Sequence, residues 1–83
     1  MNVGLLWFDD SKRPIEVRAI GAAGAYLAKH NRWPTLCQVH QDHRPAVVNL
    51  DPKTSMRIVP SQYILVDHFW IGENGEDNSR GKP

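Results

Sequence analysis

The sequence predicts an α+β fold: one long helix packed on a small sheet of three or four strands, in the order strand, helix, strand, strand, strand. One helix-periodic segment spans 13–31, and the runs around it are short, apolar and typical of strands. With 83 residues there is room for one domain, and a helix on a sheet buries both apolar surfaces. We expect a compact domain over 1–72 and a disordered polar tail over 73–83.

The helix is predicted from apolar residues that recur at spacings of three and four. They form one stripe, which comprises Ile15, Ala19, Ile20, Ala23, Tyr26 and Leu27. Outside the stripe, Glu16, Arg18 and Lys29 are predicted to face water. The capping residues Asp9, Asp10 and Ser11 and the first-turn Pro14 predict the start, and Lys29, His30, Asn31 and Pro34 predict the end.

Five short segments are strand candidates for this sheet. They span 3–8, 35–40, 46–50, 56–59 and 63–71. Pro60 and Ser61 are predicted to end the fourth segment. Asp67 with His68 predict a bend in the last segment, or its division into two short strands. In the second segment, Cys37 and Val39 share one face and are expected to point inward.

The overall charge and the hydropathy exclude several classes of protein. Ten basic and nine acidic side chains give a formal net charge of +1, which gives no strong attraction to nucleic acid or anionic lipid. No apolar run approaches the roughly 18 residues of a membrane span, and the first residues lack the pattern of a signal peptide. With a single cysteine, no intrachain disulfide can form. We therefore expect a cytoplasmic protein without a membrane partner.

Cysteine and histidine residues suggest two kinds of chemistry. Cys37, His40 and His43 are potential zinc ligands, but on a strand Cys37 and His40 project to opposite faces. Cys37 could also act as a nucleophile with His40 or His68 as base and Asp67 as orienting group. Nothing in the sequence fixes either geometry, so we expect a core cysteine, no metal, no cofactor and no enzymatic activity.

Ile20-Gly21-Ala22-Ala23-Gly24 resembles the I-G-x-x-G loop of KH RNA-binding domains, and Leu27 also fits that pattern. The resemblance implies single-stranded RNA binding through Gly21, Gly24, Lys29 and Arg32. The KH loop usually has a basic residue between its glycines, whereas alanines stand here. The preferred interpretation is an unbroken helix whose small residues permit close approach to a sheet or a partner.

The chain from about Leu6 to Gly72 also resembles a group of small uncharacterised bacterial α/β domains. The resemblance rests on W-F-D-D and K-R-P before the helix, P-T-L-C with V-H after it, V-P-S, and H-F-W-I-G at the end, residues 68–72. It implies a compact cytoplasmic domain and no known activity. Gln41 stands where the group would have a proline.

Aromatic residues motivate the leading functional hypothesis. They gather near Trp7 and Phe8, at Trp33, and at Phe69 and Trp70, and such residues anchor protein interfaces. The leading hypothesis is a non-enzymatic protein-binding or adaptor module, which binds another protein or itself. Its predicted binding residues are Arg32, Trp33, His40, His68 and Trp70. The alternatives are KH-like nucleic-acid binding and a small histidine or cysteine site.

Overall fold

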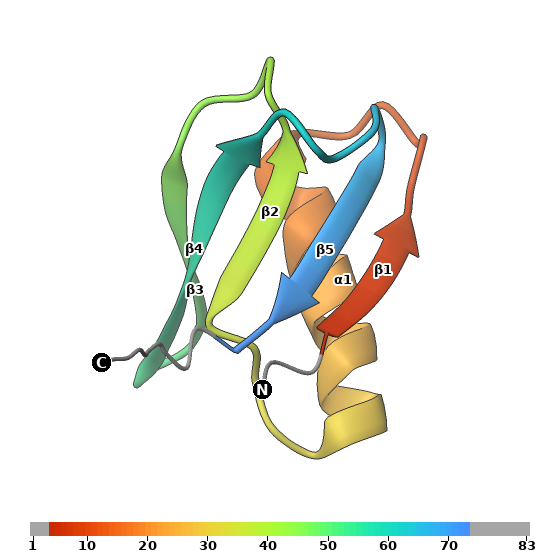
Figure 1. Cartoon of the computed structure of the whole chain (residues 1–83). Helices are drawn as coiled ribbons and strands as arrows, with labels where there is room; N and C mark the ends of the chain where they lie inside the picture. Colours follow the sequence, from red (N-terminus) through yellow and green to blue (C-terminus); the bar gives the residue numbers. More distant parts are fainter. Residues whose placement is uncertain (1–3, 74–83) are drawn as a thin grey trace, which may run out of the picture.

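The computed structural model describes residues 4–73 and confirms the α+β fold (Figure 1). Its elements are β1 (Gly4–Phe8), α1 (Ile15–His30), β2 (Leu36–His40), β3 (Ala46–Asp51), β4 (Thr54–Ser61) and β5 (His68–Gly72). The sheet has five strands instead of the expected three or four. The predicted tail from 74 onward lies outside the described residues.

The strands lie in the order β1-β5-β2-β4-β3. β2 and β4 are parallel, and all the other neighbouring pairs are antiparallel. The last strand therefore lies between the first and the second, and β1 and β3 form the two edges (Figure 1). Strand order and pairing direction could not be read from the sequence.

α1 begins and ends near the predicted residues, but its start is capped differently. Pro14 occupies the N-cap position, and no side chain caps the first turn. The Asp9 carboxylate instead accepts a hydrogen bond from the Ser11 N–H at 2.8 Å, which folds the preceding loop. At the other end, Asn31 is left-handed with φ 60° and donates its N–H to the Leu27 carbonyl, as predicted.

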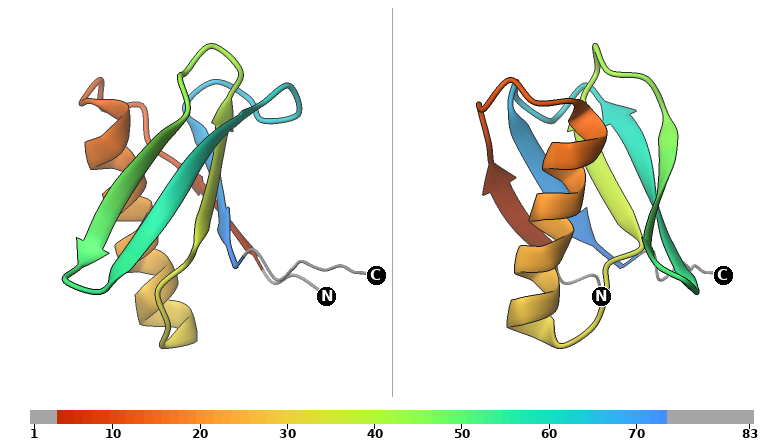
Figure 2. Two further views of the ribbon diagram at one scale, coloured as in Figure 1. Left: turned by 90° about the vertical axis from the view of Figure 1, so that its left-hand side faces the viewer. Right: turned by 180° about the vertical axis from the view of Figure 1, so that it is seen from behind.

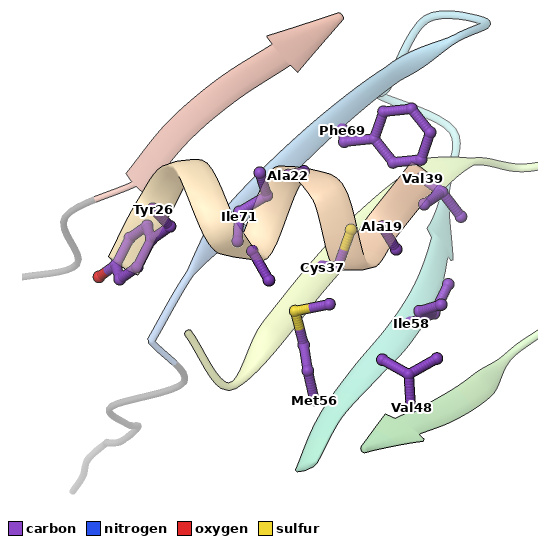
Figure 3. Packing of buried hydrophobic residues seen from close by; sticks show 11 residues of the cluster. Ala19, Ala22, Tyr26, Cys37, Val39, Val48, Met56, Ile58, Phe69 and Ile71 are labelled. Atoms are coloured by element: carbon purple, nitrogen blue, oxygen red, sulfur yellow. The ribbon is translucent and has the colours of Figure 1, made fainter. Parts of the chain in front are cut away.

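The buried face of α1 is rotated from the predicted stripe. Ala19, Ala22 and Tyr26 point from the helix toward the sheet (Figure 3). These three side chains and Ala23 are fully buried, whereas Ile20 is 42% exposed. The prediction that Arg18 faces water was wrong, because this side chain is buried among polar acceptors described below. The small alanines let the helix backbone lie close to the sheet, which the larger Ile20 would prevent.

β4 runs through Pro60, so the prediction that this proline ends the strand was wrong. The Arg57 N–H donates to the Thr35 carbonyl, so the backbone groups of Arg57 face β2. Because this direction alternates along a regular strand, the backbone groups of Ile58 and Pro60 face away from β2. Pro60 directs its nitrogen to the β3 side, where pairing stops at Ile58. A proline there removes no ladder hydrogen bond.

The last predicted strand begins later than expected. Tyr63 to Asp67 form a loop, and only His68–Gly72 enter the sheet. Asp67 is left-handed with φ 63°, and this conformation provides the bend that the sequence suggested.

α1 covers one face of the sheet, and the core lies between them (Figures 2 and 3). Inward side chains from β2, β4 and β5 meet the helix alanines; they include Cys37, Val39, Met56, Ile58, Phe69 and Ile71. Cys37 and Val39 point inward, as predicted. The opposite face has no second layer in the described part of the chain (Figure 2).

Candidate functional site

The uncovered face of the sheet, which we call the open face, is unusually apolar at its two edges. Along β1, burial alternates so that Leu5 and Trp7 turn to the helix side and Leu6 and Phe8 turn outward. Leu6 is 62% exposed and Phe8 57%, and Val47 on β3 is 65% exposed. Sheets with one solvated face normally carry polar residues there, so these side chains require an explanation.

Trp70 adds a large aromatic surface to the open face. It is half-buried on β5, opposite Leu6 of β1. Its indole lies over Gly4, and a Cβ added at Gly4 would overlap the ring. Beside it, the Phe8 and His68 rings are in tilted contact, with centroids 5.0 Å apart. Aromatic rings therefore stand at successive outward positions of β5, opposite Leu6 and Phe8 of β1.

The centre of the open face carries polar and basic groups. Gln38 lies opposite Trp70, and Arg57 of β4 lies opposite Leu36 of β2. On the regularly alternating parts of the described strands, no carboxylate occupies an outward position. The Asp42 carboxylate lies in the loop between β2 and β3, 3.6 Å from the His40 Nδ1. A partner is therefore met by apolar surface and by the Arg57 guanidinium.

A shallow depression opens between β3 and β4. Its volume is about 290 Å³, and it is lined by Pro45, Ala46, Val47, Arg57, Ile58 and Val59. Sites for small organic ligands usually occupy roughly 300–1,000 Å³ and are concave. This depression is at the lower limit and suits a single protruding side chain better than a whole cofactor.

The loop between β4 and β5 extends the apolar surface. Tyr63 is 83% exposed, Leu65 71% and Val66 58%. His68 holds the loop through its N–H, which donates to the Leu65 carbonyl at 3.1 Å, and through a contact between its Nδ1 and the Val66 carbonyl at 2.9 Å. Because His68 also contacts Phe8, this apolar loop is tied to β1.

Arg18 anchors the β1 side of the sheet to the helix. Its Nε donates to the Arg13 carbonyl at 2.8 Å, and its Nη1 donates to the Asp9 carbonyl at 3.0 Å and to the Asp67 carboxylate at 2.9 Å. The guanidinium also lies 5.6 Å from the centre of the Phe69 ring. One charged group thus fixes the end of β1, the start of α1 and the loop before β5.

Glu73 forms a second anchor at the opposite end of β5. Its carboxylate accepts from the Tyr26 hydroxyl at 2.8 Å and from Arg32, whose Nη2 lies at 2.7 Å. The hydrogen bond from Tyr26, followed by that from Arg32, lowers the pKa of Glu73, although desolvation opposes the shift. Desolvation raises the pKa of Tyr26, with a further contribution from Glu73. Glu73 therefore belongs to the folded part of the chain.

The structure brings together three of the five predicted binding residues. His40, His68 and Trp70 stand at outward positions on the strands of the open face. Trp33 and Arg32 lie after the helix instead, where Trp33 packs on the core and Arg32 binds Glu73. Sequence reasoning did not identify Leu6 and Val47, because in uninterrupted apolar runs such as GLLWF the outward positions look like core positions.

The KH-like segment is helical throughout. α1 continues from Ile15 to His30, so the loop that would join two helices around Gly21 and Gly24 is not formed. Both glycines are exposed, and an added Cβ would meet no atom of the described chain within 4 Å. The expected close approach to the sheet is therefore wrong for these glycines, because they lie on the side of α1 away from it. Lys29 is exposed in the last turn, where it suits the helix dipole.

Cys37 is buried, and burial raises the pKa of its thiol to about 12. The thiolate needed for nucleophilic attack or zinc binding is therefore strongly disfavoured. Cys37 and His40 project to opposite faces of β2, as the spacing predicted. Within 4–73, no three His, Cys, Asp or Glu side chains lie close enough together to hold a metal ion.

The chain was compared with models of protein families, with curated proteins and with solved structures, and none of them matches. Among the described residues, no helix has the length and apolar character needed to cross a membrane.

Proposed function

We propose that this domain is a non-enzymatic protein-binding module whose binding surface is the open face. The observation that carries the proposal is the exposure of Leu6, Phe8 and Val47 on that face, together with the half-buried Trp70. Exposed apolar side chains gathered on one face are typical of a protein interaction site. Tryptophan and arginine, here Trp70 and Arg57, are the residues most often found at the energetic centre of interfaces.

The proposal requires aromatic side chains that are accessible in a single chain, and full burial of both Trp7 and Trp70 would remove its main support. Both side chains are half-buried instead, and Phe8 is more exposed than either. Phe8 and Trp70 therefore remain available as aromatic anchors on the open face, whereas Trp7 and Trp33 pack on the core.

A protein partner fits this face better than a small molecule does. The surface is broad, its depression is shallow, and its polar groups are few and spread over several strands. We place this function in a reducing cytoplasm, where the lone Cys37 remains a thiol.

Site-specific photo-crosslinking in the source cells tests the proposal. A photoreactive residue is placed at Gln38 in the middle of the open face, at Val47 near its edge, or at Ile20 on the outward side of α1 as the matched control. We expect one protein to be crosslinked from Gln38 and Val47 and not from Ile20. Arg57 is exposed at the centre of the face, and the substitution Arg57→Glu should remove that crosslink because it reverses the charge there.

Two results would contradict the proposal. One is the absence of any protein crosslink from both Gln38 and Val47. The other is the same set of proteins captured from Ile20, which would indicate nonspecific contact. Crosslinked nucleic acid in place of protein would favour the nucleic-acid alternative through this face.

A further inference from the structure

β1 is an edge strand of the sheet that residues 4–73 form. In the described part of the chain its single neighbour is β5, and no strand lies beyond it (Figure 1). All five residue pairs between β1 and β5 are in regular register, from Gly4 opposite Gly72 to Phe8 opposite His68. The free side of β1 therefore presents a straight row of backbone groups, which another extended chain can pair with.

The pairing pattern identifies those backbone groups. The Asp9 N–H donates to the Asp67 carbonyl at 3.0 Å, and these two residues continue the register of β1 and β5. In an antiparallel ladder every second residue turns to the same neighbour, so Trp7 and Leu5 also face β5. The N–H and C=O groups of Gly4, Leu6 and Phe8 consequently point to the free edge.

We propose that a second copy of this chain adds to this edge, with the two β1 strands antiparallel and Leu6 opposite Leu6. The three edge residues are symmetric about Leu6, so Gly4 of one chain then lies opposite Phe8 of the other. Each of these pairs exchanges two backbone hydrogen bonds, which satisfies every outward group of both strands. Twofold symmetry of this kind is the most common arrangement of soluble oligomers.

The side chains of β1 favour a second copy over an unrelated strand. Its residues, GLLWF, carry no charge, so two copies bring no like charges together. The symmetric register sets the bulky Phe8 against the small Gly4. Because the Trp70 indole already lies over Gly4, the incoming Phe8 ring gains an aromatic neighbour on the open face.

This inference goes beyond the proposed binding face, because it concerns the edge of the sheet and a different partner. Pairing of β1 with β1 leaves Gln38 and Val47 uncovered, because they lie on β2 and β3. The crosslinks expected from Gln38 and Val47 are therefore compatible with a dimer and with a single chain, and either proposal can fail without the other.

Charge exchange at Leu6 tests the symmetric register. Leu6→Lys or Leu6→Glu places two like charges opposite each other at the centre of the pairing, whereas a mixture of the two chains places opposite charges there. The matched controls are Val47→Lys and Val47→Glu, at a similarly exposed outward position on the other edge strand. Circular dichroism confirms folding, and sedimentation velocity gives the mass.

We expect the mass of two chains for the wild type and for both Val47 variants, one chain for each Leu6 variant alone, and two chains for their mixture. A wild type that sediments as one chain at the highest concentration reached would overturn the proposal. A dimer that survives Leu6→Lys would also overturn it, because another surface must then hold it. If the mixture of Leu6→Lys and Leu6→Glu chains sediments with the mass of one chain, the symmetric register is excluded.

Discussion

The two edge strands of this sheet, β1 and β3, expose their free sides in different ways. β3 follows Pro45, has a register irregularity between Asn49 and Asp51, and is followed by Pro52 and Lys53. Bulges, prolines and charges are the devices by which proteins prevent edge-to-edge pairing. β1 has none of them within its five residues: its register is regular and every residue is uncharged.

The two edges also differ in how they are fixed. On the β1 side, Arg18 binds Asp9 and Asp67 at one end of the β1–β5 pair. At the other end of β5, Glu73 accepts a hydrogen bond from Tyr26 of α1. On the β3 side, the described contacts are mainly packing, with a turn in which the Asp51 carboxylate accepts from the Lys53 N–H at 2.8 Å. An edge strand that is unprotected and firmly held is suited to binding. Because its backbone is already ordered, little conformational entropy is lost when another strand pairs with it.

The largest expected effect comes from removing the Arg18 anchor. Arg18→Met leaves the Asp67 carboxylate and two carbonyls without their partner, and we expect a loss of about 3 kcal/mol in the free energy of unfolding. Urea unfolding gives this value. Hydrogen exchange should accelerate in β1 and β5 more than in β3. Arg57→Met on the open face is the control and should change stability by less than about 0.5 kcal/mol. Equal losses in the two variants would refute the role of Arg18.

A smaller loss is expected from a change confined to β1. In Gly4→Ala the new Cβ overlaps the Trp70 indole, which must move away, at a cost of about 1–3 kcal/mol. Tryptophan fluorescence should report the displaced ring, and thermal unfolding should report the loss. Asn49→Ala, at an exposed position on β3, is the matched control and should be nearly neutral. Unchanged fluorescence and stability in Gly4→Ala would disprove the close contact.

The glycines of α1 should respond in the opposite direction. Because an added Cβ meets nothing at Gly21 or Gly24, each change to alanine should stabilise the chain by about 1 kcal/mol through helix propensity alone. Neither change should alter the mass measured by sedimentation, since the outward side of α1 is not the proposed dimer surface. Conversion of a dimer to single chains by Gly24→Ala would instead show that α1, and not β1, forms the interface.

The smallest effect concerns the Glu73 anchor and its dependence on pH. The pKa of Glu73 is lowered in the folded chain from an ordinary 4.5, so its ionised form stabilises the fold. That contribution is present above pH 4.5 and is lost as the pH falls through the lowered pKa. Because the pair is partly exposed, Glu73→Gln should cost less than about 1 kcal/mol at neutral pH, and the difference should vanish in acid. Tyr26→Phe should weaken the same pH dependence, and a constant difference at all pH values would contradict this assignment.

The candidate site was only partly predictable. His40, His68 and Trp70 were predicted to be binding residues, and they share the open face. Arg18 was missed because helical periodicity places it outside the apolar stripe, and nothing local reveals the distant Asp67 carboxylate that it binds. Leu6 and Val47 were hidden in apolar runs whose outward positions depend on which neighbour covers each face.

By itself the sequence determined the fold class, the single helix with its left-handed Asn31 end, and the inward direction of Cys37 and Val39. These features follow from local periodicity and from residue conformational preference, which act over a few neighbouring residues. Only the tertiary structure decided that β5 inserts between β1 and β2, that Pro60 lies within a strand, and that no strand formed by residues 4–73 pairs with the outer side of β1. Each of these depends on contacts between residues far apart in the chain, and such contacts leave no periodic pattern in the sequence.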